Sequence, residues 1–170
     1  MQVQSCDVCQ RVKCKFDKPA LSLHPVPGQL GAWQQIGIDL IGPLPETPSG
    51  NKYIMTVTDY FSKFPEAKAI PTKEASNVAA FLHSLFMRHG FCPCVFFDQG
   101  CEFCNQVTDC LFGLTGTEHR VTSAYHPQAN GLVEGFNQTM SDALVKKCND
   151  DQHRWDEHIE SVLFAYRMSG

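Results

Sequence analysis

Two segments decide the fold, Val95-Phe96-Phe97-Asp98-Gln99-Gly100 and Tyr125-His126-Pro127-Gln128-Ala129-Asn130-Gly131-Leu132-Val133-Glu134. Asp98 ends a short apolar run, and Glu134 lies on a helix that the pattern predicts after a proline-containing loop. Between these two acids there is room for one helix and one strand. Asp39 follows another apolar run upstream. Three carboxylates that meet at one edge of a sheet are what divalent-metal chemistry on phosphates requires.

The flanking sequence alternates between strand and helix patterns. Short apolar runs predict strands over residues 36–41, 53–58, 64–70, 95–97 and 118–122. Apolar residues at helical spacing predict helices from a Thr72 cap to Gly90, around 103–114, from Asn130 onward, and from Trp155 to Tyr166. Asn51 beside Gly50 predicts a turn that makes the first two strands antiparallel neighbours. The order indicates an α/β fold, a five-stranded mixed sheet with helices on both faces.

Composition is that of one globular domain of 170 residues. The formal charge is −4, from 14 basic and 18 acidic side chains, whereas nucleic-acid binders usually carry a basic surface. Three of the negative charges would be metal ligands, and bound cations would make the local charge around them positive. The chain has nine cysteines, and we find neither a signal peptide nor an apolar run long enough to span a membrane. Reduced thiols in an intracellular protein are therefore expected.

Residues 1–30 lack the strand and helix patterns of the rest of the sequence, and we divide the chain into this segment and a core over 31–170. Cys6 and Cys9 form a C-x2-C pair ahead of a proline-spaced linker. One such pair supplies two of the four ligands of a structural zinc site. We therefore expect an incomplete zinc site with free thiols, and no bound Zn²⁺.

The strands that end near Asp39 and Asp98 are expected to be neighbours, so that their carboxylates lie side by side. Glu134 would reach them from the polar face of its helix. Such a set can hold two Mg²⁺ ions, which bind through a few carboxylates, waters and phosphate oxygens. An isolated aspartate at a strand end is more often a turn residue, and we assign Asp59 to that role. Composition and periodicity alone do not separate Asp39 from Asp59.

A resemblance separates them. The chain resembles the integrase catalytic core of gypsy-class long-terminal-repeat retrotransposons, and hence retroviral integrases, over roughly residues 30 to 168. The matching residues are Trp33 with Ile36-Gly37-Ile38-Asp39-Leu40-Ile41-Gly42-Pro43-Leu44-Pro45, residues 53–64, Arg88-His89-Gly90, Asp98-Gln99-Gly100 with Glu102-Phe103, Tyr125-His126-Pro127-Gln128, Asn130-Gly131-Leu132-Val133-Glu134 with Phe136-Asn137, and Phe164-Ala165-Tyr166-Arg167.

The resemblance implies a ribonuclease-H-like fold with Asp39, Asp98 and Glu134 as the catalytic and metal-binding triad. It also implies Mg²⁺- or Mn²⁺-dependent processing of DNA ends and their joining to target DNA, by a nuclear homo-oligomer of at least two subunits. The residues that would contact DNA are Tyr125, His126, Gln128, Asn137, Lys146 and Lys147. Interaction with the helix dipole is an equal explanation for the two lysines. Cys6 and Cys9 resemble the second half of the family's His2Cys2 zinc domain.

Departures from the family pattern raise an alternative. Gly135 stands where an arginine usually follows the catalytic glutamate, which removes a phosphate contact and costs the helix ~1 kcal/mol. Cys101, Cys104 and Ala129 replace typical residues nearby. These changes, with the negative charge, favour a catalytically silent, domesticated copy that acts as a nucleic-acid-binding or protein-interaction module. A related ribonuclease-H-like nuclease is the third interpretation.

Overall fold

The computed structural model describes residues 31–97, 106–121, 127–149 and 151–169. Its strands are β1 (Gln35–Ile41), β2 (Tyr53–Asp59), β3 (Pro65–Ile70), β4 (Cys94–Phe97) and β5 (Glu118–Val121). Its helices are α2 (Ala75–His89), α3 (Gln106–Thr115), α4 (Pro127–Lys147), the 3-10 helix η2 (Gln152–His158) and α5 (Ile159–Arg167).

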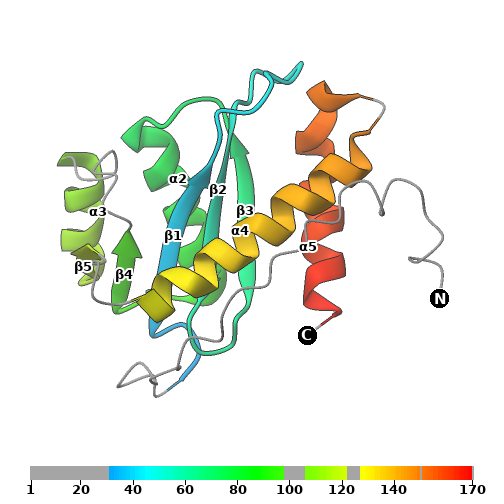
Figure 1. Cartoon of the computed structure of the whole chain (residues 1–170). Helices are drawn as coiled ribbons and strands as arrows, with labels where there is room; N and C mark the ends of the chain where they lie inside the picture. The colour runs from blue at the N-terminus through cyan, green and yellow to red at the C-terminus, as the bar shows by residue number, and fades with distance from the viewer. Residues whose placement is uncertain (1–30, 98–105, 122–126, 150, 170) are drawn as a thin grey trace.

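The five strands form one mixed sheet in the order β3-β2-β1-β4-β5 (Figure 1). β1 pairs antiparallel with β2, which pairs antiparallel with β3. On its other side β1 pairs parallel with β4, which pairs parallel with β5. β1 is therefore the central strand, and the predicted mixed, ribonuclease-H-like architecture is confirmed.

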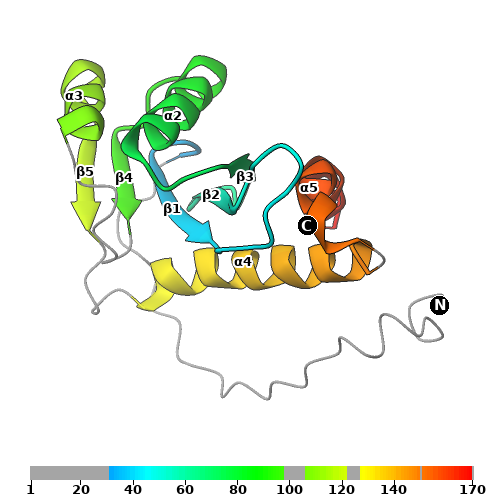
Figure 2. The same cartoon turned by 90° about the horizontal axis from the view of Figure 1, so that it is seen from above.

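Helices cover both faces of the sheet, with α2 and α3 on one side and α4 on the other (Figure 2). Alternation along β1 sends Ile36 and Ile38 into the core beneath α2 and α3. Ile41 contributes to the second core, which α4, η2 and α5 build on the opposite face. No helix within the described ranges is long and apolar enough to cross a membrane.

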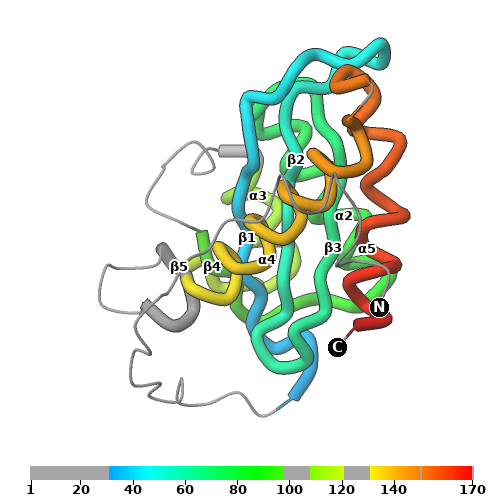
Figure 3. The backbone as a smooth tube through the Cα atoms, turned by 45° about the vertical axis from the view of Figure 1, so that its right-hand side comes forward, coloured from blue at the N-terminus to red at the C-terminus, as the bar shows by residue number. Residues whose placement is uncertain are grey.

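The β1–β2 connection is tied to η2, which lies beside it although about a hundred residues separate them (Figure 3). Thr47 Oγ1 and Asn51 Nδ2 each donate to Asp156 Oδ2 at 2.9 Å. Trp155 Nε1 donates to the carbonyl oxygen of Pro45 at 2.7 Å. These bonds hold η2, which follows α4 in the chain, against the β1–β2 connection.

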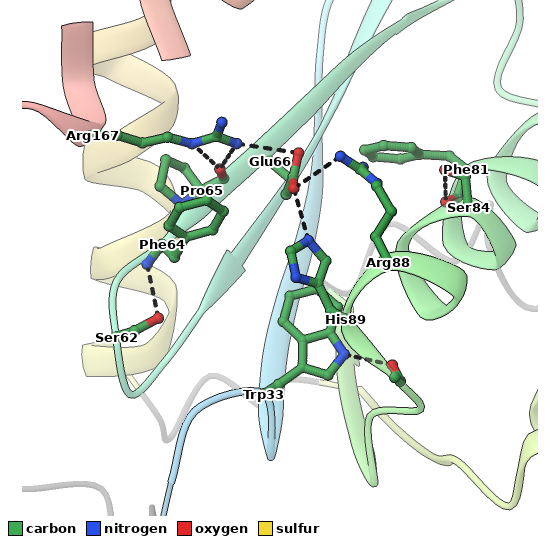
Figure 4. A network of polar contacts seen from close by, with 11 residues as sticks. Trp33, Ser62, Phe64, Pro65, Glu66, Phe81, Ser84, Arg88, His89 and Arg167 are labelled. Atoms are coloured by element: carbon green, nitrogen blue, oxygen red, sulfur yellow. Dashed lines mark hydrogen bonds and ion pairs between the residues drawn. The ribbon is translucent and has the colours of Figure 1, made fainter. Parts of the chain in front are cut away.

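A buried carboxylate joins both helical layers at edge strand β3 (Figure 4). The Glu66 side chain is 8% exposed, and its Oε1 lies 3.2 Å from Arg88 Nη1 and 2.9 Å from His89 Nε2, both at the end of α2. Its Oε2 lies 3.2 Å from Nη2 of Arg167, on α5. The Arg167 guanidinium also lies over the Phe64 ring, 4.2 Å from its centroid. Glu66 thus forms ion pairs with two arginines, Arg88 and Arg167, whose helices lie on opposite faces of the sheet.

Three details differ from the sequence prediction. Thr72 does not cap α2, which begins at Ala75; its Oγ1 accepts instead from Asn77 Nδ2 at 2.8 Å. Helix α4 begins at Pro127, before Asn130, because proline suits the first turn of a helix. The last predicted helix, from Trp155 to Tyr166, is α-helical only from Ile159 onward; its first residues belong to the 3-10 helix η2, whose backbone is non-helical at Arg154.

Candidate active site

Asp39 lies within the central strand β1, one residue beyond the point where the parallel pairing of β1 with β4 ends. The preceding residue, Ile38, pairs with Phe97, the last residue of β4. Asp98 follows Phe97 in the sequence and lies outside the described residues. The prediction that the strands leading to the two aspartates are neighbours is confirmed.

Gly37 allows α4 to lie directly on β1. A Cβ at this position would stand 2.5 Å from Tyr60 Oη and 2.7 Å from Val133 Cγ2, distances that a real Cβ does not adopt. Val133 belongs to α4 and immediately precedes Glu134. The absence of a side chain at Gly37 therefore sets the distance between the helix of Glu134 and the strand of Asp39.

Asn137 connects the helix to the aspartate. Its Nδ2 donates to Asp39 Oδ2 at 2.6 Å, and its Oδ1 accepts from Thr56 Oγ1 at 2.8 Å. The backbone N–H of Leu40 donates to Asp39 Oδ1 at 2.8 Å. Both carboxylate oxygens thus accept hydrogen bonds from protein donors, which fix the orientation of the carboxylate on β1.

Glu134 lies one helical turn before Asn137 and therefore on the same face of α4. Its side chain is exposed, as the predicted polar face requires. The described residues include no group of three metal-ligating side chains, and Asp98 is not among them. The chemistry of Asp39 and Glu134 nevertheless fits a hard divalent cation, because carboxylate oxygens are the ligands that Mg²⁺ prefers.

A small apolar cluster lies where Gly37 meets α4 and includes Tyr60, Val133 and Phe96. Tyr60 is 3% exposed, and its ring lies 5.4 Å from that of Phe96. Burial, followed by the nearby Cys94 thiol, raises the pKa of Tyr60, so the phenol stays protonated. Asp59, the neighbour of Tyr60, is the buried last residue of β2; its side chain accepts from Trp33 N at 3.0 Å and from Ser62 N, in the turn that follows, at 2.8 Å.

Several predicted site residues lie elsewhere. Tyr125, His126, Cys6 and Cys9 fall outside the described residues, and Gln128 is in the first turn of α4 without a described side chain. Lys146 and Lys147 are in the last turn of α4, where cations complement the helix dipole. Their contacts with DNA, and that of Asn137, stay predictions.

Gly37 and Thr56 are the site residues that sequence reasoning missed. Thr56 gave a weak signal, a hydroxyl residue inside the apolar strand Tyr53-Ile54-Met55-Thr56-Val57. Its side chain is fully buried, so the hydroxyl requires a partner. Sequence alone does not identify Asn137, 81 positions away, as that partner.

An apolar pocket of about 170 Å³ lies toward the other end of α4, away from the carboxylates. Leu144 and Cys148 of α4 line it together with Ile54 and Trp155. It belongs to the core between α4, η2 and the sheet, and carries none of the acids.

Known proteins similar in sequence point in one direction. The chain is 26% identical over 139 residues to the retrovirus-related Pol polyprotein from transposon 412 of Drosophila melanogaster. It is 27% identical over 170 residues to gypsy retrotransposon integrase-like protein 1 of Mus musculus, and 28% identical over 137 residues to that of Homo sapiens. The resemblance to gypsy-class integrases is confirmed.

These matches cover 81%, 98% and 81% of the chain, and 11%, 32% and 26% of the respective relatives. The chain therefore spans between about a tenth and a third of the length of these curated relatives. No protein-family model matches it. The similarity supports an integrase catalytic core, and the observed mixed sheet agrees with it.

Proposed function

We propose that the chain is the catalytic core of an integrase-type polynucleotidyl transferase that processes DNA ends and joins them to target DNA. The observation that carries the proposal is the 2.6 Å hydrogen bond between Asn137 of α4 and Asp39 of β1. It brings the helix face of Glu134 to the strand that carries Asp39, and Asp98 follows the last residue of the parallel neighbour of that strand. Similarity to integrase-like proteins supports the same conclusion.

Asp39, Asp98 and Glu134 would hold Mg²⁺ or Mn²⁺ in this core. Two such cations, when bound, supply activation of a water or 3′-hydroxyl nucleophile and stabilisation of the leaving oxygen in an in-line displacement. The task of Asn137 and of the Leu40 N–H is to orient the Asp39 carboxylate. Gly37 keeps α4 close enough for Glu134 to act with it.

DNA would approach from the first turn of α4, to which Gln128 belongs and which Tyr125 and His126 precede in the sequence. The three acids would repel the DNA phosphates in a chain whose net charge is already −4. Cation binding to these acids would therefore be a condition for the approach of a phosphate. We further propose that the protein acts in the nucleus as an oligomer of at least two chains.

Labelled double-stranded oligonucleotides with Mg²⁺ or Mn²⁺ provide the test. We expect nicked and joined products from the wild type and from Asp142→Asn, a control carboxylate on α4 that accepts from Gln138 at the helix surface. We expect none from Asp39→Asn or Asp98→Asn. Equal products from all four proteins, or none from the wild type in either metal, would overturn the proposal. The second result would favour the silent, domesticated alternative.

A further inference from the structure

The hydroxyl of Thr56 stands behind the Asn137–Asp39 pair, in the interior of the protein. Thr56 is on β2, directly opposite Asp39 in the antiparallel register with β1. Its side chain is completely buried, and its Oγ1 lies 2.8 Å from Asn137 Oδ1 and 3.3 Å from the backbone carbonyl oxygen of Asp39. Both neighbouring atoms are acceptors and the hydroxyl has a single proton, so it donates to the nearer one, Asn137 Oδ1.

The chemistry of the three groups determines the orientation of the Asn137 amide. A carboxylate accepts only, so the amide group that faces Asp39 Oδ2 at 2.6 Å must be the NH₂. The amide oxygen then faces Thr56, whose proton satisfies it. In the flipped orientation, two oxygens would meet at Asp39 while the NH₂ faced the hydroxyl, and the hydrogen-bonded chain would be broken.

We propose that Thr56 is a positioning residue for the candidate metal site, because its hydroxyl locks the Asn137 amide in the orientation that holds the Asp39 carboxylate. Loss of the hydroxyl leaves Asn137 Oδ1 next to an apolar group, and the amide gains freedom to rotate. The Asp39 carboxylate then loses the donor that fixes Oδ2. The consequence for metal binding rests on the proposed function, whereas the orientation of the amide does not.

The chain offers a matched control on the same face of β2. Thr58 is two positions along the strand and 2% exposed, and its Oγ1 has no hydrogen-bond partner within the described ranges. Thr56→Val and Thr58→Val each replace a buried hydroxyl by a methyl group of similar size. Only the first removes a donor that the site uses. Thr56→Ser retains the hydroxyl and should behave as the wild type.

The test reads the Asn137 side chain directly, by ¹H–¹⁵N correlation spectra of the metal-free protein. We expect the NH₂ protons of Asn137 to exchange with solvent about three- to tenfold faster in Thr56→Val than in the wild type. This factor corresponds to the free energy of one lost buried hydrogen bond. In Thr58→Val and Thr56→Ser the exchange should stay as in the wild type. Thr56→Ala replaces the valine variant if that variant does not fold. Unchanged Asn137 exchange in the valine or alanine variant would overturn the inference.

A titration with Mn²⁺ separates this inference from the proposed function. We expect affinity to fall about tenfold in Thr56→Val, the size of effect that residues behind metal ligands commonly show. The wild type and Thr58→Val should bind equally. Altered amide exchange in Thr56→Val, with no Mn²⁺ binding to any of these proteins, would uphold the positioning of Asn137 and refute the metal site.

Discussion

A methyl group at Gly37 should separate the two elements that carry Asp39 and Glu134. In Gly37→Ala, the new Cβ would stand 2.5 Å from Tyr60 Oη, 2.7 Å from Tyr60 Cε1 and 2.7 Å from Val133 Cγ2. Comfortable contacts between carbon atoms lie at about 3.5–4.0 Å. Tyr60 and Val133 are 3% and 6% exposed, so neither has open space to move into. The Tyr60 ring and the helix that carries Val133 must therefore both move away from Gly37, each by about 1 Å.

Two magnitudes follow from that displacement. Overpacking of a close-packed interior lowers the free energy of unfolding by about 1–3 kcal/mol. Alanine offsets roughly 0.5–1 kcal/mol of this loss, because the unfolded chain has less conformational entropy with alanine than with glycine. We expect the free energy of unfolding of Gly37→Ala to fall by about 1–2 kcal/mol. A shift of about 1 Å between ligands can cost a hundredfold in function, so affinity for Mn²⁺ should fall by about ten- to a hundredfold.

Urea denaturation followed by circular dichroism gives the first quantity, and calorimetric titration with Mn²⁺ gives the second. Gly135→Ala is the control, because a Cβ there meets no heavy atom within 4 Å. That variant should gain about 1 kcal/mol of stability within α4 and bind the metal normally. Trimming Val133 to alanine in the Gly37→Ala background should restore part of the affinity. A Gly37→Ala protein with wild-type stability and affinity would refute the reasoning.

Two further predictions concern the rest of the core. Glu66→Gln should lower the free energy of unfolding, measured by urea denaturation, by roughly 2 kcal/mol. This is less than the roughly 3–5 kcal/mol of a fully buried ion pair, because its partner Arg88 is half exposed. The control is Glu46→Gln at an exposed ion pair, which should cost less than about 1 kcal/mol. Burial raises the pKa of the Cys92 thiol to about 12, so the folded state retains a proton that the unfolded state releases above about pH 9. Stability should be complete below that pH and fall by roughly 1.4 kcal/mol per unit above it.

The outcomes that contradict these two predictions are distinct. Equal losses in Glu66→Gln and Glu46→Gln would mean that the buried carboxylate does not hold α2 and α5 at β3. For the thiol, urea denaturation between pH 8 and 11 should show a smaller alkaline loss in Cys92→Ala than in the wild type. The same loss in both proteins would assign the alkaline instability to other groups.

Local patterns were sufficient for most of the architecture. The apolar runs around Ile38 and Phe97 predicted strands, and helical spacing from Leu132 to Leu144 predicted the buried face of α4. The two-residue repeat of a strand and the 3.6-residue repeat of a helix are visible within a few residues. They do not depend on which other element covers the apolar face. The prediction for Asp59 was right about the turn that its side chain stabilises, because that bond reaches Ser62, only three positions away; its second bond, to Trp33, was not predicted.

Helix ends were less predictable. Thr72 has the chemistry of a cap, yet its hydroxyl accepts from the Asn77 side chain, and α2 begins three residues later at Ala75. The 3-10 segment Gln152–His158, with its non-helical backbone at Arg154, also escaped prediction. Trp155 bonds to Pro45 at that point, and this contact across the fold competes with continuation of a regular helix.

The sequence by itself determined the order of the elements and the candidate acids Asp39, Asp98 and Glu134, because strand and helix periods and the resemblance can be read locally. Only the tertiary structure decided how closely α4 lies on β1, through the missing side chain of Gly37. It also decided that Thr56 and Asn137 meet behind Asp39. Those contacts join residues about eighty to a hundred positions apart. They depend on the packing of all the intervening elements, which no local period encodes.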